Sequence, residues 1–314
     1  MPVRLRVLVV FAVAALALVS CGSTSATTGG SANGGGTGTT APIGPACPVV
    51  PLPIVVTVDQ WGDIVRQVVG RCGDVTTIVT GTSGDPHDYE PTPGDLAAFG
   101  RAQLVVMNGA GYDAWAAKAV DALAARPSVI DVAEKAGWHE GDNPHLWYQP
   151  SVVDRVSGDI ARSLAWKDPL ALEYLAQRSI DWRHAREPYD AAIRAVKQKT
   201  AGKRYVATES VFDLLAADVG LTNVTPAGYR NASANESEPS PGDVNDVQKL
   251  LRDKQVDVLV FNAQTSGAIP EQLRRAAEDG GVPVVDVTES IPPGQPGFVA
   301  WQVDQLERLA KALG

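Results

Sequence analysis

Two of the four histidines in this 314-residue sequence lie in loops of the same kind. His87 and His145 each occupy a polar, proline-containing segment a few residues beyond an apolar run. If those runs are strands of a parallel sheet, both imidazoles emerge at its carboxyl edge, where open α/β sheets place their ligand crevice. One loop histidine alone is usually a solvated side chain. Two at the same topological position favour a shared site, and imidazole is a common ligand for divalent transition metals.

Acidic residues follow apolar runs in the second half of the chain in the same way. Glu209 follows the run 205–208, and Glu289 follows the run 282–287. Glu209 could instead be an ordinary acid at a helix N-terminus, which the helix dipole favours. Asp286 is the nearest alternative to Glu289, but the alternation of residues 284–287 predicts that Asp286 faces the sheet or an adjacent layer. Two neutral imidazoles and two carboxylates would neutralise a divalent ion, which a closed cleft requires.

Short β-branched runs alternate with helical patterns, which is typical of βα units and a parallel sheet. We expect one series of strands at 54–58, 76–80, 104–107 and 129–132, and a second series at 205–208, 256–261 and 282–287. Residues 169–199 predict one long helix between the series, which Pro188 could kink or divide. Further helices are expected at 269–279 and 298–313. The predicted fold class is α/β, with two lobes, each a mainly parallel sheet flanked by helices, joined by one long rigid helix.

The N-terminus has the pattern of an export signal. Arg4 and Arg6 precede an apolar run at 7–19 that is too short to span a bilayer. The run ends at Cys21 in a segment that resembles the lipobox of bacterial lipoproteins, although an ordinary cleaved signal with a stray cysteine would look similar. Acyl chains on Cys21 would hold the protein on the extracytoplasmic face of the cell membrane. Residues 22–40 are almost wholly Gly, Ser, Thr, Ala and Asn, which predicts a flexible tether.

These features predict a division of the chain into five parts. We expect a lipoprotein signal peptide at 1–20, a lipidated cysteine and tether at 21–46, an N-terminal metal-binding lobe at 47–165, a connecting helix at 166–200 and a C-terminal metal-binding lobe at 201–314. Removal of the signal would take away two arginines and no acid, which changes the formal net charge from −9 to −11. Nucleic acid is therefore not an expected partner.

Cys47 and Cys72 are the cysteines that remain beyond the signal. An exported protein meets oxidising conditions, so we expect them to form a disulfide between the start of the first strand and the end of the first helix. The alternative, a thiolate metal site, needs more sulfur than two widely spaced cysteines supply.

Several segments together resemble the zinc- and manganese-type solute-binding lipoproteins of ABC importers. They are GDPHDYEPTP at 84–93, Asn108-Gly109 with Trp115 close behind, and NPHLW at 143–147, in the family's order and covering the chain from about residue 53 onward. The resemblance implies that His87 and His145 bind the ion and that Glu209 stands where the family has its third ligand. Glu289 stands where the family usually has Asp. Asp85, Tyr89 and Glu90 are expected to orient His87 as neighbours of the ligand.

The resemblance implies capture of Zn²⁺ or Mn²⁺ between the lobes and delivery to a membrane permease with its cytoplasmic ATPase. Glu209 favours the manganese-type pattern, yet nitrogen and oxygen sites in general bind zinc more tightly, so both metals remain open. The expected protein is a monomer. We expect no catalytic activity, because no HExxH pair and no obvious general base accompany the site. A zinc-dependent hydrolase and a surface adhesin are the alternative functions.

Overall fold

The computed structural model describes residues 45–81, 86–235 and 237–314, all within the compact unit Pro42–Gly314. The expected signal peptide, Cys21, most of the expected tether and Asp85 lie outside the described residues. In the part of the chain that is described, no helix has both the length and the apolar character needed to cross a membrane.

The first sheet contains four parallel strands in the order β2-β1-β3-β4. The central strands are buried along most of their length, as expected when helices cover both faces of a parallel sheet. The strands are β1 (Leu52–Val58), β2 (Gly73–Val79), β3 (Leu104–Met107) and β4 (Ser128–Asp131). The helices of this half are α1 (Asp59–Val69), η1 (Gly70–Cys72), α2 (Pro93–Arg101), α3 (Ala114–Asp121), α4 (Val132–Ala136), η2 (Leu146–Tyr148) and α5 (Pro150–Lys167).

The second sheet has the same topology, with parallel strands in the order β6-β5-β7-β8. Its strands are β5 (Arg204–Ala207), β6 (Thr222–Asn223), β7 (Val258–Asn262) and β8 (Val284–Val287). Its helices are η4 (Ser210–Phe212), α7 (Asp213–Asp218), α8 (Ala227–Ala234), α9 (Pro241–Arg252), α10 (Ala268–Gly280) and α11 (Phe298–Ala312). The seven expected strands are confirmed with small shifts at their ends. Only β6 lacked a prediction, because two residues are too few to give a pattern.

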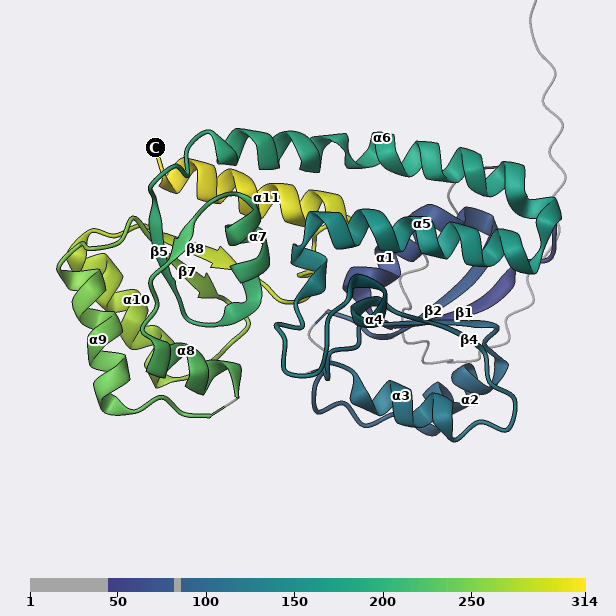
Figure 1. The fold of residues 1–314 in the computed structure, drawn as a ribbon, viewed down its shortest axis with the longest axis horizontal. Helices are drawn as coiled ribbons and strands as arrows, with labels where there is room; N and C mark the ends of the chain where they lie inside the picture. The colour runs from purple at the N-terminus through teal and green to yellow at the C-terminus, as the bar shows by residue number, and fades with distance from the viewer. Residues whose placement is uncertain (1–44, 82–85, 236) are drawn as a thin grey trace, which may run out of the picture. The chain divides into compact units, whose positions relative to one another are not determined.

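One long helix connects the two halves, as expected. The short helix η3 (Pro169–Ala171) leads into α6 (Leu172–Lys197), which continues through Pro188. The interpretation that this proline divides the helix is therefore wrong. Figure 1 shows α6 extending across both sheets, with α5 beside one part of it and α11 beside the other.

A shared apolar core joins the two halves. The largest cluster of buried side chains includes Val56 of the first sheet and Val260 of the second. Where α6 packs against α11, the rings of Tyr189 and Phe298 lie 5.8 Å apart. A wide rotation of one half against the other would expose part of this core to water, which the hydrophobic effect opposes.

A disulfide closes the start of the first half. Cys47 and Cys72 are bonded, with their Cα atoms 5.0 Å apart. The backbone N–H of the neighbouring Arg71 donates to the hydroxyl of Tyr174 in α6 at 2.8 Å. These contacts fasten the segment that enters β1 to the end of α1 and to the long helix.

Replacement of both Cys47 and Cys72 by alanine should lower the free energy of unfolding by about 3 kcal/mol, because the cross-link closes a loop with a sequence separation of 25 residues. Urea unfolding followed by circular dichroism would measure the difference. Reducing agent should lower the stability of the wild type and leave the variant unchanged. Equal stability of the two oxidised proteins would contradict a stabilising cross-link.

Candidate metal centre

The four predicted ligands lie beyond the carboxyl ends of parallel strands. His87 follows β2, Glu209 follows β5 and Glu289 follows β8, whereas His145 lies farther along the chain, beyond β4 and the short helix α4. All four line one cleft between the two halves. The matching topology of the two sheets therefore brings two histidines and two glutamates, one pair from each half, to a common space.

The peptide before His87 is fixed by a buried indole. Trp115 Nε1 donates to the carbonyl oxygen of Pro86 at 2.9 Å. The imidazole of His87 packs edge-on against Tyr112, with ring centroids 4.5 Å apart. Tyr89, expected to orient His87, packs its ring on Trp115 and donates its hydroxyl to Asp95 at 2.8 Å.

Glu90, also expected beside His87, is exposed to solvent. Tyr89 supports His87 indirectly, because it packs on Trp115, which holds the peptide before His87. The helix α2 that carries Asp95 begins with a capping box between Thr92 and Asp95, so the loop after His87 ends in a firmly held turn.

Asn143 sets the orientation and the tautomer of His145. Its side-chain oxygen accepts both the backbone N–H of His145 at 3.0 Å and a hydrogen bond from Nδ1 at 2.7 Å. The amide oxygen can only accept, so the proton of a neutral His145 is on Nδ1 and the lone pair is on Nε2. The Asn143 amide also donates to the Ser210 carbonyl of the second half at 2.8 Å.

The segment before His145 is tied to the first sheet. Asn108, at the end of β3, donates from its side-chain amide to the carbonyl oxygen of Pro144 at 2.9 Å. Its side-chain oxygen accepts from Trp61 Nε1 at 2.9 Å. Asn108 is fully buried, and these contacts explain why an asparagine ends this strand.

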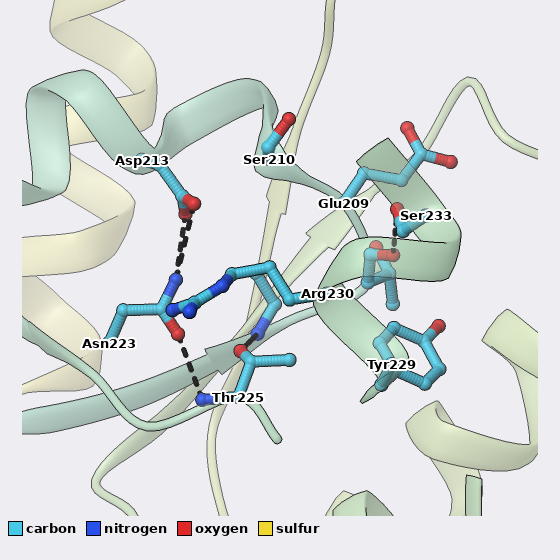
Figure 2. A pocket seen from close by; sticks show the side chains of 10 residues that line it. Glu209, Ser210, Asp213, Asn223, Thr225, Tyr229, Arg230 and Ser233 are labelled. Carbon is cyan, nitrogen blue, oxygen red and sulfur yellow. Dashed lines mark hydrogen bonds between the residues drawn. The ribbon is translucent and has the colours of Figure 1, made fainter. Parts of the chain in front are cut away.

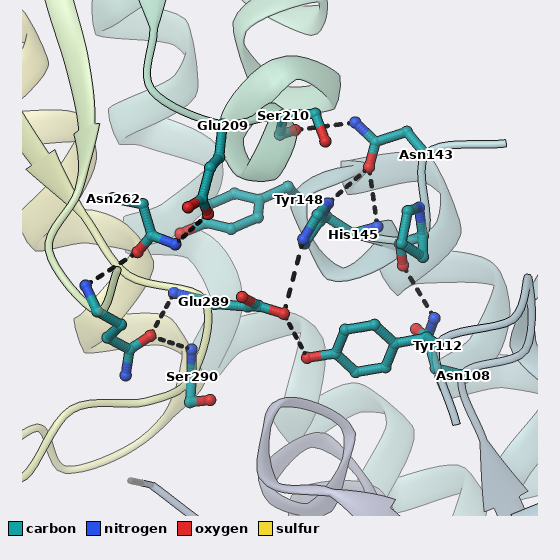
Figure 3. A network of polar contacts seen from close by, with 12 residues as sticks. Asn108, Tyr112, Asn143, His145, Tyr148, Glu209, Ser210, Asn262, Glu289 and Ser290 are labelled. Atoms are coloured by element: carbon teal, nitrogen blue, oxygen red, sulfur yellow. Dashed lines mark hydrogen bonds and ion pairs between the residues drawn. The ribbon is translucent and has the colours of Figure 1, made fainter. Parts of the chain in front are cut away.

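Glu289 lies directly opposite His145 across the cleft. Its Oε1 is 3.7 Å from His145 Nε2 and accepts a 2.8 Å hydrogen bond from the hydroxyl of Tyr112 (Figure 3). The nitrogen–oxygen distance is longer than a hydrogen bond, but it is close to the roughly 3.3 Å that separates two ligands of one tetrahedral zinc ion.

The electrostatics keep Glu289 ionised. Burial opposes ionisation, but the contact with His145, the hydrogen bond from Tyr112 and the nearby His87 outweigh it and hold the pKa of Glu289 below its ordinary value of 4.5. Burial and the adjacent Glu289 carboxylate raise the pKa of Tyr112 well above its usual range, so its hydroxyl remains a donor. Glu289 thus places a negative charge against two imidazoles at neutral pH.

Glu209 is held by neighbours from its own sheet. Its Oε2 accepts a 2.6 Å hydrogen bond from the side-chain amide of Asn262, and its Oε1 accepts from the hydroxyl of Thr265. Asn262 ends β7, and its backbone N–H donates to the hydroxyl of Thr208 at 2.9 Å. These bonds fix the turn that carries Glu209 to the end of the adjacent strand.

A small cavity lies behind Glu209 in the second half. Figure 2 shows Asp213 and Asn223 in contact within it and Arg230 reaching toward them. The hydroxyl of Tyr205 also donates to Asp213, at 2.7 Å. Burial raises the pKa of Asp213, against the effect of these hydrogen bonds and of Arg230. This cluster supports the start of α7, immediately beyond Glu209 and Ser210.

The four predicted ligands share the cleft but do not yet form a coordination set. Among the described residues, no three His, Cys, Asp or Glu side chains form a group that could hold a metal ion. Glu209 points to Asn262 and Thr265, whereas His145 and Glu289 face each other. Side-chain rearrangement is therefore needed before an ion could contact all four.

The remaining candidates from the sequence lie outside this network. Asp286, which the strand alternation predicted to face the sheet or an adjacent layer, forms an ion pair with Arg274 of α10. His139 and His184 are exposed and pair with Asp142 and Glu187. Tyr112 was not among the predicted site residues, because its contact with Glu289 joins residues 177 positions apart. The signal that could have indicated Tyr112 is its position shortly after the end of β3, at the same edge of the sheet as the predicted ligands.

A family model settles the relationship of the chain to known proteins. The model described as zinc-uptake complex component A, periplasmic (ZnuA), matches residues 54–312. The chain belongs to this ZnuA family. The match confirms the resemblance expected from the histidine-containing segments, and it covers both sheets and the connecting helix.

Curated relatives are similar over most of the chain. The high-affinity zinc uptake system protein ZnuA of Bacillus subtilis is 26% identical over 241 residues, which are 71% of this chain and 74% of the relative. The manganese ABC transporter substrate-binding lipoprotein PsaA of Streptococcus anginosus is 24% identical over 302 residues, which are 90% of this chain and 88% of the relative. The relatives of the chain are thus named for different metals.

Solved structures share the fold. The periplasmic zinc-binding protein TroA of Treponema pallidum superimposes with a TM-score of 0.71 at 17% identity, covering 84% of this chain and all of that one. The laminin-binding protein Lmb of Streptococcus agalactiae is described as having adhesin and metal-transporting activity. It superimposes with a TM-score of 0.68 at 21% identity, covering 84% of this chain and 100% of Lmb. At these identities the likeness concerns the architecture alone.

Replacement of Asn143 by alanine should weaken zinc binding by about 10- to 100-fold, because His145 loses the acceptor that fixes its tautomer. Competition with a fluorescent zinc chelator would measure the affinity. Asn143→Asp keeps an acceptor oxygen and should lose less. Wild-type affinity in Asn143→Ala would contradict the role of this contact.

Proposed function

We propose that His87, His145, Glu209 and Glu289 bind one divalent transition-metal ion, zinc or manganese, in the cleft between the two halves. The observation that carries this proposal is the approach of His145 Nε2 to within 3.7 Å of Glu289 Oε1, with the ring of His87 packed against Tyr112, the residue that donates to the same carboxylate. Two imidazole nitrogens and two carboxylate oxygens are a donor set that both metals accept.

The charges fit a divalent cation. Two neutral imidazoles leave the two carboxylates to supply two negative charges, so the loaded site would be neutral overall. Glu289 and His145 are largely buried, with side chains 19% and 9% exposed. An uncompensated charge at this depth is costly, and the ion would offset it.

As a member of the ZnuA family, the chain is the substrate-binding component of a metal ABC importer. We propose that it delivers the ion to a membrane permease with a cytoplasmic ATPase, as a monomer anchored through lipid on Cys21 to the extracytoplasmic face. The names of lipoproteins among its relatives support the anchor. The functional units in this proposal are the two lobes at 47–165 and 201–314 and the connecting helix at 166–200.

Ion capture in this fold requires local movement more than wide opening. The core shared by the two sheets resists a large rotation. Glu209 must exchange its hydrogen bonds with Asn262 and Thr265, at least in part, for a bond to the ion. Release to the permease would then reverse this exchange together with a modest rotation of the lobes.

His87→Ala and His145→Ala should each weaken zinc binding by at least about 100-fold, because each removes one nitrogen ligand. Isothermal titration in the presence of a competing chelator would measure the affinity. His139→Ala and His184→Ala are matched controls, since these side chains are 86% and 71% exposed and lie outside the cleft.

Both controls should bind zinc as the wild type does. In a strain lacking the native protein, the controls should restore metal uptake, whereas the cleft variants should not. Unchanged zinc affinity in both His87→Ala and His145→Ala would refute the proposed site.

A further inference from the structure

Tyr112 occupies the centre of the proposed site without being one of its ligands. Its ring is fully buried, 4.5 Å from the ring of His87, 6.2 Å from that of His145 and 5.1 Å from that of Trp147. Aromatic neighbours on these sides restrict its rotation. Its hydroxyl donates to Glu289 Oε1 at 2.8 Å, so a rigid group of the first half determines how this carboxylate is presented.

The backbone that presents Tyr112 is left-handed over three residues, and it is strained at Ala110. Gly109, Ala110 and Gly111 all have positive φ, at 76°, 52° and 83°. Among the described residues, only Ala110 and Lys254 adopt this conformation without being glycine. A Cβ atom at Gly109 would lie 2.1 Å from Asp131 Oδ1, so only glycine fits there. Strain of this kind persists where the surroundings enforce it, and it is concentrated at functional sites.

Asp113 enforces this turn. Its two carboxylate oxygens accept the backbone N–H groups of Asn108 and Gly109 at 2.7 and 2.9 Å. The backbone N–H of Tyr112 closes the turn on the carbonyl oxygen of Gly109 at 3.0 Å. The position of the Tyr112 hydroxyl is therefore built into the loop after β3.

A hydrogen bond on one carboxylate oxygen affects how the group can bind a metal. Chelation needs one lone pair of each oxygen directed at the same ion. A hydrogen bond that fixes the orientation of the carboxylate can oppose this geometry, and it still leaves the second lone pair of the bonded oxygen for a single metal bond. The Tyr112 hydroxyl takes one lone pair of Glu289 Oε1, the oxygen that also faces His145 Nε2, and so fixes how this carboxylate is turned toward the cleft. Both oxygens of Glu209 accept hydrogen bonds, so one metal bond would displace one of them and chelation would displace both. The surroundings of both carboxylates thus favour one metal bond from each.

The number of metal bonds bears on the choice of metal. One bond from each of two glutamates and two histidines gives four ligands, which suits the tetrahedral preference of zinc. Manganese prefers six ligands, rich in oxygen, and a carboxylate that chelates through two oxygens raises the ligand number. Restricting chelation therefore disfavours manganese more than zinc.

We propose that Tyr112 is a specificity-determining residue that holds Glu289 to a single metal bond and so favours zinc over manganese. This inference rests on the proposed function of the cleft. It identifies zinc as the preferred cargo, and it assigns the preference to a hydroxyl that does not bind the ion.

The test is Tyr112→Phe, which keeps the ring and removes the donor. The affinities for zinc and for manganese would each be measured by chelator competition. We expect the ratio of manganese to zinc dissociation constants to fall by about tenfold, the lower limit of typical effects of groups that orient metal ligands. Cobalt(II) absorption gives a second readout, because tetrahedral cobalt absorbs visible light far more strongly than six-coordinate cobalt does. The intensity should fall in Tyr112→Phe.

Tyr148→Phe is the matched control. Tyr148 is also fully buried, and its hydroxyl lies within hydrogen-bond distance of two acceptors of the second half, the Thr288 carbonyl oxygen at 2.7 Å and the side-chain oxygen of Gln305 at 2.8 Å, neither of which is a carboxylate. Its metal ratio and cobalt spectrum should match those of the wild type.

An unchanged ratio in Tyr112→Phe would overturn the inference, and so would an equal loss of both metals, which would indicate a purely structural role. A similar change of ratio in Tyr148→Phe would overturn it as well. Failure of the wild type to bind either metal would instead refute the proposed function of the cleft, and the inference with it.

Discussion

The carboxylate of Glu289 meets a hydroxyl and an imidazole from the opposite half of the molecule, and the rest of the site depends on this contact. Tyr112 donates to it, and His145 approaches the same oxygen. A negative charge at this depth needs compensation from nearby groups. Tyr112 and His145 belong to the half that contains the first sheet, and Glu289 belongs to the half that contains the second. The need to compensate the buried charge therefore favours a cation at the place where the two halves meet.

The positions of these groups are set by a fold that limits relative motion. The two sheets share one apolar core, and α6 packs along α11 and α5 across them. A hydrogen bond across the cleft adds to this, since the side-chain amide of Gln60 donates to the Glu289 carbonyl at 2.8 Å. Because this packing holds the ligand-bearing loops at a nearly constant spacing, the side chains that contact the ligands can determine which metal is preferred.

The sequence predicted the architecture well for clear physical reasons. Buried parallel strands are continuous apolar runs, and loops at their carboxyl ends share one edge, so His87, His145, Glu209 and Glu289 could be expected in one cleft. What could not be predicted is which groups orient them. Tyr89 follows His87 closely yet contacts Asp95, whereas Tyr112 and Asn143 control ligands through contacts that only the folded chain creates. The present direction of Glu209, toward Asn262, likewise follows from packing of neighbouring strand ends and has no sequence pattern.

The most direct test of the central claim is X-ray absorption spectroscopy at the zinc edge of the metal-loaded protein. The account predicts four nitrogen or oxygen ligands at about 2.0–2.1 Å, with the outer-shell scattering of two imidazoles. If the scattering of one imidazole is lost in His145→Ala, that scattering is assigned to the His145 ring. A spectrum with sulfur ligands, or with no imidazole scattering, would contradict the account.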